Sequence, residues 1–230
     1  MNAKIKIMKR PLLNVMHINS TKLMVLAGFF YSSWPLGYWL NPKAARGLAS
    51  DLGASHQPYN WLFITMDVVC GILVGIVSGK LLMIIRSGSN RKNLPGLWIA
   101  VLGVGGFGLF TAVGALLPLN CIQGSPQCVV SLHTSYFLIH GIFSIGSIAS
   151  LTISIVAIWL LLLLKEQDVI SLAHLTPAIF LFVWLSFGAL TLYLVLHHRS
   201  SALAQHFFIG FCCLWLIALP YFVRLIIRLQ

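Results

Sequence analysis

The stretch NWLFITMDVVCGILVGIVSGKLLMII, residues 60 to 85, decides the fold class of this 230-residue chain. Asp67 and Lys80 are its only acidic or basic side chains, and Lys80 lies close enough to one end to reach the membrane surface. A helix crosses the hydrocarbon core of a bilayer with about 20 apolar residues. The stretch therefore predicts a transmembrane helix.

Apolar runs of similar length occur on both sides of this one, at about 23 to 40, 96 to 118, 133 to 164, 173 to 196 and 206 to 226. Apolar residues make up 59% of the chain and charged residues only 8%, so one soluble core could not bury them. The sequence predicts a single all-α domain, residues 1 to 230, that is an integral membrane bundle of six transmembrane helices. The fourth run is longer than one crossing needs, which predicts a tilted or projecting helix.

Basic residues predict the orientation, because Lys and Arg gather on the cytoplasmic side of a membrane protein. With the N-terminus inside, twelve of them lie on or near the cytoplasmic face: Lys4, Lys6, Lys9, Arg10, Lys22, Lys80, Arg86, Arg91, Lys92, Lys165, Arg224 and Arg228. Only Lys43, Arg46 and Arg199 fall outside. We expect both termini in the cytoplasm.

The net charge of +11 could also indicate a nucleic-acid-binding protein. However, the basic residues stand at the ends of apolar runs and do not form a hydrophilic surface with interleaved aromatics. They are topology signals, so we predict membrane lipid as a partner and no nucleic acid.

The second run carries a glycine stripe and an acid. Gly71, Gly75 and Gly79 form a doubled G-x-x-x-G, which lets a neighbouring backbone approach closely and could also receive a membrane-protein partner. Asp67 is four residues before Gly71 and shares its helix face. An acid inside a membrane is costly and indicates a functional site, although a structural hydrogen bond between helices would also explain it.

The fourth run offers Asp67 a partner. His140 is seven residues into its run and Asp67 seven into its own, so both lie roughly 10 Å deep from the outer side. His133 and Ser144 share the face of His140, and a carboxylate that orients an imidazole is a recurring arrangement for a base or a metal ligand. A zinc site needs at least three protein ligands and a haem needs facing axial ligands, so we predict no metal and no cofactor.

The first outer loop contains Ser50 and Asp51 within a partly ordered segment of small and turn-forming residues. Ser50 could be a nucleophile, but it lacks the G-x-S-x-G elbow, and a helix or turn cap explains it better. The predicted ligand pocket comprises Ser50, Asp51, Asp67, His133, His140 and Ser144.

Two further patterns concern packing and covalent structure. The third run contains the string G-x-G-G-x-G from Gly103 to Gly108, but without a preceding strand it indicates close helix packing and not a dinucleotide site. Cys121 and Cys128 share a polar outer loop with Gly124 and Pro126, and we expect them to form a disulfide.

Several short motifs in this order resemble a known family. They are Ser50 to Ala54, Trp61 to Asp67, Leu117 to Asn120, His140-Gly141 and Ala204-Gln205-His206. The chain resembles the uncharacterised bacterial and archaeal membrane family catalogued as domain of unknown function 998, and more loosely the Frag1/DRAM/Sfk1-type six-span proteins. The resemblance implies a six-helix bundle in a prokaryotic cytoplasmic (inner) membrane and no established activity. The family pattern often has a basic residue where this chain has His206.

Three functional hypotheses follow. The first is a protein that binds a lipid head group or small amphiphile in an outward-facing polar pocket. The second is an intramembrane lipid hydrolase or transferase in which His140 is a base, Asp67 orients it, and Ser50 or a water is the nucleophile. The third is a structural subunit of a membrane complex.

Overall fold

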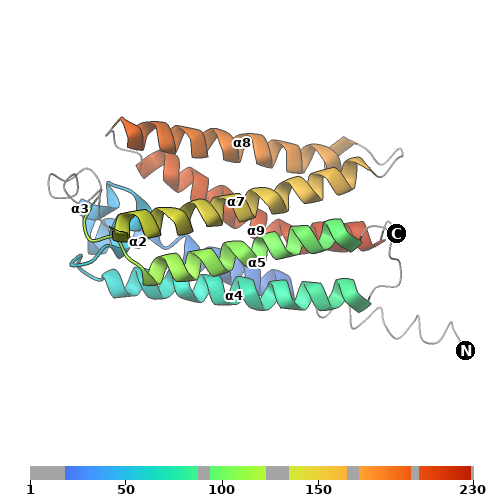
Figure 1. Ribbon diagram of the computed structural model, residues 1–230, viewed down its shortest axis with the longest axis horizontal. Coiled ribbons are helices and arrows are strands. Elements are labelled where there is room, and N and C mark those ends of the chain that lie inside the picture. The colour runs from blue at the N-terminus through green and yellow to red at the C-terminus, as the bar shows by residue number, and fades with distance from the viewer. Residues whose placement is uncertain (1–18, 88–93, 123–134, 165–170, 198–201, 229–230) are drawn as a thin grey trace, which may run out of the picture.

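The computed structural model describes residues 19–87, 94–122, 135–164, 171–197 and 202–228. Within these ranges the chain forms helices and no strand, which confirms the all-α prediction (Figure 1). The elements are a helix over residues 19–31, then α2 (Trp34–Leu40), α3 (Pro42–Ala45), η1 (Ala49–Gly53), α4 (Asn60–Ser87), α5 (Leu94–Leu116), α7 (Ser135–Leu163), α8 (Ser171–Leu196) and α9 (Ala202–Arg228).

Five helices in the described part of the chain are long and apolar enough to cross a membrane, namely α4, α5, α7, α8 and α9. Their bounds fall within a few residues of the predicted runs. Large apolar side chains remain exposed on them, including Ile145, Phe182 and Leu203. Because a soluble protein does not expose such a surface, the chain is a multi-pass membrane protein.

The first predicted run is not one continuous helix. Its helical residues 19–31 are followed by a break at Ser32 and Ser33, after which α2 begins at Trp34 with Pro35 in its first turn. Proline lacks a backbone N–H and fits the first turn of a new helix better than the interior of an old one. The six-span count and the cytoplasmic position of both termini stay predictions.

Three helices, α4, α5 and α7, pack side by side with α5 in the middle (Figure 1). Glycines permit this, because a Cβ added at Gly71 of α4 would lie 2.4 Å from the carbonyl oxygen of Gly108 on α5. A Cβ added at Gly103 would lie 2.7 Å from the carbonyl oxygen of Ser150 on α7. The glycine string in the third run therefore serves close packing, as predicted.

The glycine stripe on α4 divides into two parts. Gly71 is buried against α5, whereas a Cβ added at Gly75 or Gly79 would meet no described atom within 4 Å. These two glycines are exposed together with Ile72 and Ile76. A partner bound at this stripe stays a prediction, and it would meet Gly75 and Gly79 but not Gly71.

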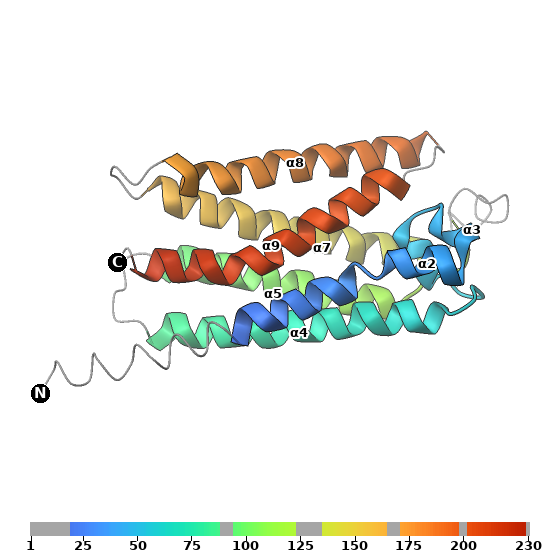
Figure 2. The ribbon, with the colours of Figure 1, turned by 180° about the vertical axis from the view of Figure 1, so that it is seen from behind.

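The other long helices complete the bundle. α9 crosses the bundle diagonally, as Figure 2 shows, and α8 packs against α7 and α9. The helix over residues 19–31 contacts α9 where the Cys213 thiol donates a hydrogen bond to the Gly28 carbonyl oxygen, at 3.4 Å. Trp184 of α8 and Trp215 of α9 are fully buried in the shared core.

The predicted first outer loop is ordered and closes one end of the bundle, where α2, α3 and η1 gather (Figure 2). Asn41 holds it from two sides: its side-chain oxygen accepts from the backbone N–H of Ala44, and its side-chain nitrogen donates to Gln57. The backbone N–H of Ser55 donates to the carbonyl oxygen of Leu119, at 2.6 Å. This last hydrogen bond ties the loop to the chain that follows α5.

Candidate functional site

A cavity of about 170 Å³ lies under this ordered loop. Its walls come from the helix over residues 19–31, α2, η1, α4, α5, α7, α8 and α9, so nearly every element contributes to it. An apolar cavity of about 150 Å³ in a protein core can hold one benzene molecule. The space therefore suits a group of about that size and not a whole lipid.

Aromatic rings form much of the lining, and we call these residues the aromatic wall. The aromatic wall comprises Tyr31, Trp34, Phe63, Phe107, Phe110, Phe143, Trp184 and Phe208. Rings pack against each other across it, for example Tyr31 edge-on to Phe107 with centroids 5.3 Å apart. Such contacts hold the rings in fixed positions and present their faces and edges to a ligand.

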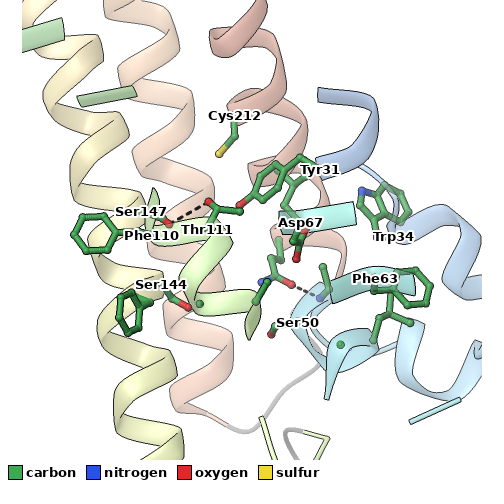
Figure 3. Close-up of a pocket in the computed structure, with 18 of the residues that line it drawn as sticks. Tyr31, Trp34, Ser50, Phe63, Asp67, Phe110, Thr111, Ser144, Ser147 and Cys212 are labelled. Carbon is green, nitrogen blue, oxygen red and sulfur yellow. Dashed lines mark hydrogen bonds between the residues drawn. The ribbon is translucent and has the colours of Figure 1, made fainter. Parts of the chain in front are cut away.

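Asp67 lines the same cavity, a little under two turns after the start of α4. No hydrogen bond or ion pair joins its side chain to another residue of the described ranges. Figure 3 shows it in the view between Tyr31 and Trp34. A carboxyl group left without a partner inside a membrane protein is energetically costly, so the structural hydrogen bond considered from the sequence is not seen.

His140 lines the same cavity from α7, but its partners are backbone carbonyls at the end of α5. Its Nδ1 lies 3.0 Å from the carbonyl oxygen of Leu117 and 3.2 Å from that of Gly114. Carbonyl oxygens only accept, so Nδ1 carries the proton, and in the neutral ring Nε2 is the basic nitrogen. The structure brings Asp67 and His140 to one cavity without a hydrogen bond between them.

The predicted serines also lie at the cavity. Ser50 lines it from η1 and Ser144 from α7, while the Ser147 hydroxyl forms a hydrogen bond with Thr111 of α5, at 3.3 Å. Figure 3 shows Ser144 and Ser147 on the α7 side and Ser50 near η1. Neither Ser50 nor Ser144 is hydrogen-bonded to His140 in the described structure, so no activated nucleophile is assembled.

Two other predicted pocket residues are placed differently. Asp51 is fully buried and does not line the cavity: its Oδ2 accepts from the backbone N–H of Leu48, at 2.8 Å, and so caps η1. The capping role considered for Ser50 therefore belongs to its neighbour. His133 lies outside the described residues, and so does Cys128, so the disulfide with Cys121 stays a prediction.

The N-terminus of α9 holds the loop over the cavity. The side-chain oxygen of Gln205 accepts from the backbone N–H of Ala49 in η1. Next to it, His206 stacks on Trp34 with ring centroids 3.7 Å apart and planes 4° apart. The family pattern often has a basic residue at the position of His206, and in this chain the side chain at that position packs against an aromatic ring.

The cavity is open on the α7 side. Ser144 and Ile148 both line it, yet both side chains are exposed, and Ile148 retains 40% of its accessible surface. The next turn presents Ile142 and Ile145 outward, with 63% and 68% exposed. An apolar surface therefore adjoins the opening.

Several lining residues were not predicted as part of a site. Trp34 and Trp184 fall in the middle of apolar runs, where packing is the expected role, and Tyr31 and Thr111 belong to no motif. Asp67 is the one acid within the predicted apolar runs, and these four residues stand in other runs, so no local signal marks them. No group of three or more His, Cys, Asp or Glu side chains in the described ranges is arranged to hold a metal ion.

These features define the class as an α-helical, multi-pass membrane protein with an aromatic and acidic cavity at one end of its bundle. Residues 24–220 match the model of the family described as "Protein of unknown function (DUF998)". The chain therefore belongs to this family, which confirms the resemblance inferred from its motifs. No curated protein and no solved structure matches it significantly. The looser similarity to Frag1/DRAM/Sfk1-type proteins, the prokaryotic source and the inner membrane stay predictions.

Proposed function

We propose that this protein binds a lipid head group or the polar end of a small amphiphile in the cavity, from the outer side of the membrane. The observation that carries the proposal is Asp67, whose carboxyl group lines a cavity of about 170 Å³ without a partner in the described chain. A ligand group would supply that partner. Buried polar groups in folded proteins are almost always hydrogen-bonded, which is why the missing partner indicates a ligand.

The position of the opening supports an amphiphile over a purely water-soluble ligand. Ser144 and Ile148 are exposed at the opening, beside outward-facing isoleucines of α7. A molecule whose polar end enters there can leave its hydrocarbon chain against this apolar surface. The cavity needs to accommodate only the polar end, in agreement with its size.

Binding is favoured over catalysis because no hydroxyl in the described structure is hydrogen-bonded to His140, and the Nδ1 of that ring is engaged by the end of α5. A hydrolase or transferase would need a nucleophile next to its base. The hydrogen bonds of His140 instead join α7 to α5 at the cavity edge.

The test is mass spectrometry of molecules that co-purify with the protein in native nanodiscs. Ala115→Phe places a phenyl ring at the cavity lining, and a benzene-sized group nearly fills such a space. Ala189→Phe makes the same change on the exposed surface of α8 and is the matched control. We expect a molecule that is retained by the wild type and Ala189→Phe and lost from Ala115→Phe. Equal retention by all three folded proteins would refute the proposal.

A further inference from the structure

We propose that the group held in this cavity is an organic ammonium cation, from a primary amine to a quaternary ammonium, with Asp67 as its counter-charge. The inference rests on the proposed function and narrows its ligand class. Three independent features of the cavity support it: the sign of its charge, the hydrogen-bonding capacity left unused in its lining, and the aromatic wall.

The described lining of the cavity holds an acid and no lysine or arginine to pair with it. Asp67 is the one acidic residue among the described residues of the lining, and none of the described lining residues is Lys or Arg. The loop over residues 123–134, whose structure is not described, contains no Lys or Arg in its sequence either. A phosphate, sulfate or carboxylate would meet Asp67 with no cation to offset the repulsion, so an anionic group is disfavoured.

Two ring donors in the lining are already used. The indole N–H of Trp184 donates to the Cys212 sulfur, at 3.3 Å, and the Nδ1–H of His140 donates to carbonyls of α5. The groups without a hydrogen bond in the described ranges include the carboxyl group of Asp67, the hydroxyls of Tyr31, Ser50 and Ser144, the indole N–H of Trp34 and the side-chain nitrogen of Gln205. Asp67 is the one group of this set that only accepts, so its carboxylate suits a donor such as an ammonium group, and the hydroxyls can accept from it as well.

The aromatic wall also attracts a cation. The face of an aromatic ring carries negative potential and attracts a cation within about 6 Å of its centre, and aromatic cages are a recurrent device for binding alkylated ammonium groups. Tyr31 and Trp34 appear on either side of Asp67 in Figure 3. Rings around a single carboxylate favour a cation with apolar substituents over a hydrated metal ion, which needs several oxygen ligands.

The experiment measures calorimetric binding of four octyl probes to the full chain in uncharged dodecyl maltoside micelles, with empty micelles subtracted. The probes are octylammonium, octyltrimethylammonium, octanol and octanoate. We expect at least one ammonium probe to bind more tightly than octanol and octanoate. Asp67→Asn should weaken that binding about thirtyfold or more, because removing one partner of a buried charge pair is costly. Octanol binding should change little.

Two variants keep the test independent of folding. Asp67→Glu retains the carboxylate and should retain the preference for ammonium probes, while Glu166→Gln removes one negative charge from the segment between α7 and α8 and should match the wild type. Equal affinity for octylammonium, octyltrimethylammonium and octanol, or an Asp67→Asn variant that keeps the ammonium preference, would overturn the inference.

The outcomes separate this inference from the proposed function. If octanol binds, loses that binding in Ala115→Phe, and no ammonium probe binds more tightly, the inference of a cationic ligand would be overturned. The proposed function of the cavity as a binding site would then remain. Probe binding unaffected by Ala115→Phe would overturn both. Competition against the bound ammonium probe then identifies the source of the ammonium group. Displacement by phosphatidylethanolamine or phosphatidylcholine, but not by phosphatidylglycerol, indicates a lipid head group. Displacement by ethanolamine or choline indicates a soluble amine.

Discussion

The glycine stripe of α4 provides a quantitative test of how closely α4 and α5 pack. A Cβ added at Gly71 would lie 2.4 Å from the Gly108 carbonyl oxygen and 2.7 Å from the Cβ of Ala112. Neither atom is the end of a flexible side chain, so α4 and α5 would have to separate. Gly75 and Gly79 have the same helical spacing, but no described atom lies within 4 Å of a Cβ added at either.

The substitution Gly71→Ala combines two opposing terms. Alanine in a helix interior is more favourable than glycine by about 0.5–1 kcal/mol, and this gain applies to all three positions. Overpacking a tight contact costs about 1–3 kcal/mol, and this cost applies only to Gly71. We therefore expect Gly71→Ala to be less stable than Gly75→Ala by about 1–3 kcal/mol, with Gly75→Ala and Gly79→Ala as stable as the wild type or slightly more stable.

The assay is unfolding of the purified protein by sodium dodecyl sulfate in mixed micelles, followed by tryptophan fluorescence. The three alanine variants differ only in which glycine is replaced, so each controls for the others. If Gly71→Ala proved as stable as Gly75→Ala, the close approach of α4 and α5 would be wrong.

Three further outcomes follow from the cavity and its surroundings. His140→Phe leaves the two α5 carbonyls without their donor, so its free energy of unfolding, from the same unfolding assay, should fall by about 1–3 kcal/mol; unchanged stability would contradict the hydrogen bond. Gln205→Leu removes the acceptor that holds η1, and hydrogen exchange measured by mass spectrometry should speed up across residues 49–53 and not across α8. If Cys121 and Cys128 form a disulfide, a thiol reagent should titrate three of the five cysteines in denatured protein, and a count of five would exclude it.

The long helices could be predicted from the sequence because their signal is local. A run of apolar residues long enough to cross a bilayer must satisfy its backbone hydrogen bonds within itself, so α4 and α5 follow from composition and length. The break inside the first run is less local, since the start of α2 depends on Pro35 and on the packing of Trp34 against His206.

The candidate site could be predicted only in part. Asp67 and His140 were placed at matched depth from their positions in their runs, and both do line one cavity. The partners of His140 could not be predicted, because they depend on where α5 ends and which carbonyls that end leaves open. Trp34 could not be assigned to the cavity, because a sequence does not say which face of a ring borders a cavity. Similarly, Gly71 and Gly75 look equivalent until the neighbouring helix is placed.

Locating a heavy-atom probe in the cavity would show whether an ammonium group binds against Asp67. We would determine the structure of the protein with a bromoalkylammonium amphiphile and with its uncharged bromoalkyl alcohol. We expect density for the ammonium group within hydrogen-bonding distance of the Asp67 carboxylate, with the bromine toward Ile148, and loss of that density in Asp67→Asn. Density confined to the lipid-facing groove between α5 and α7, near Ile99 and Ile153, would contradict this expectation.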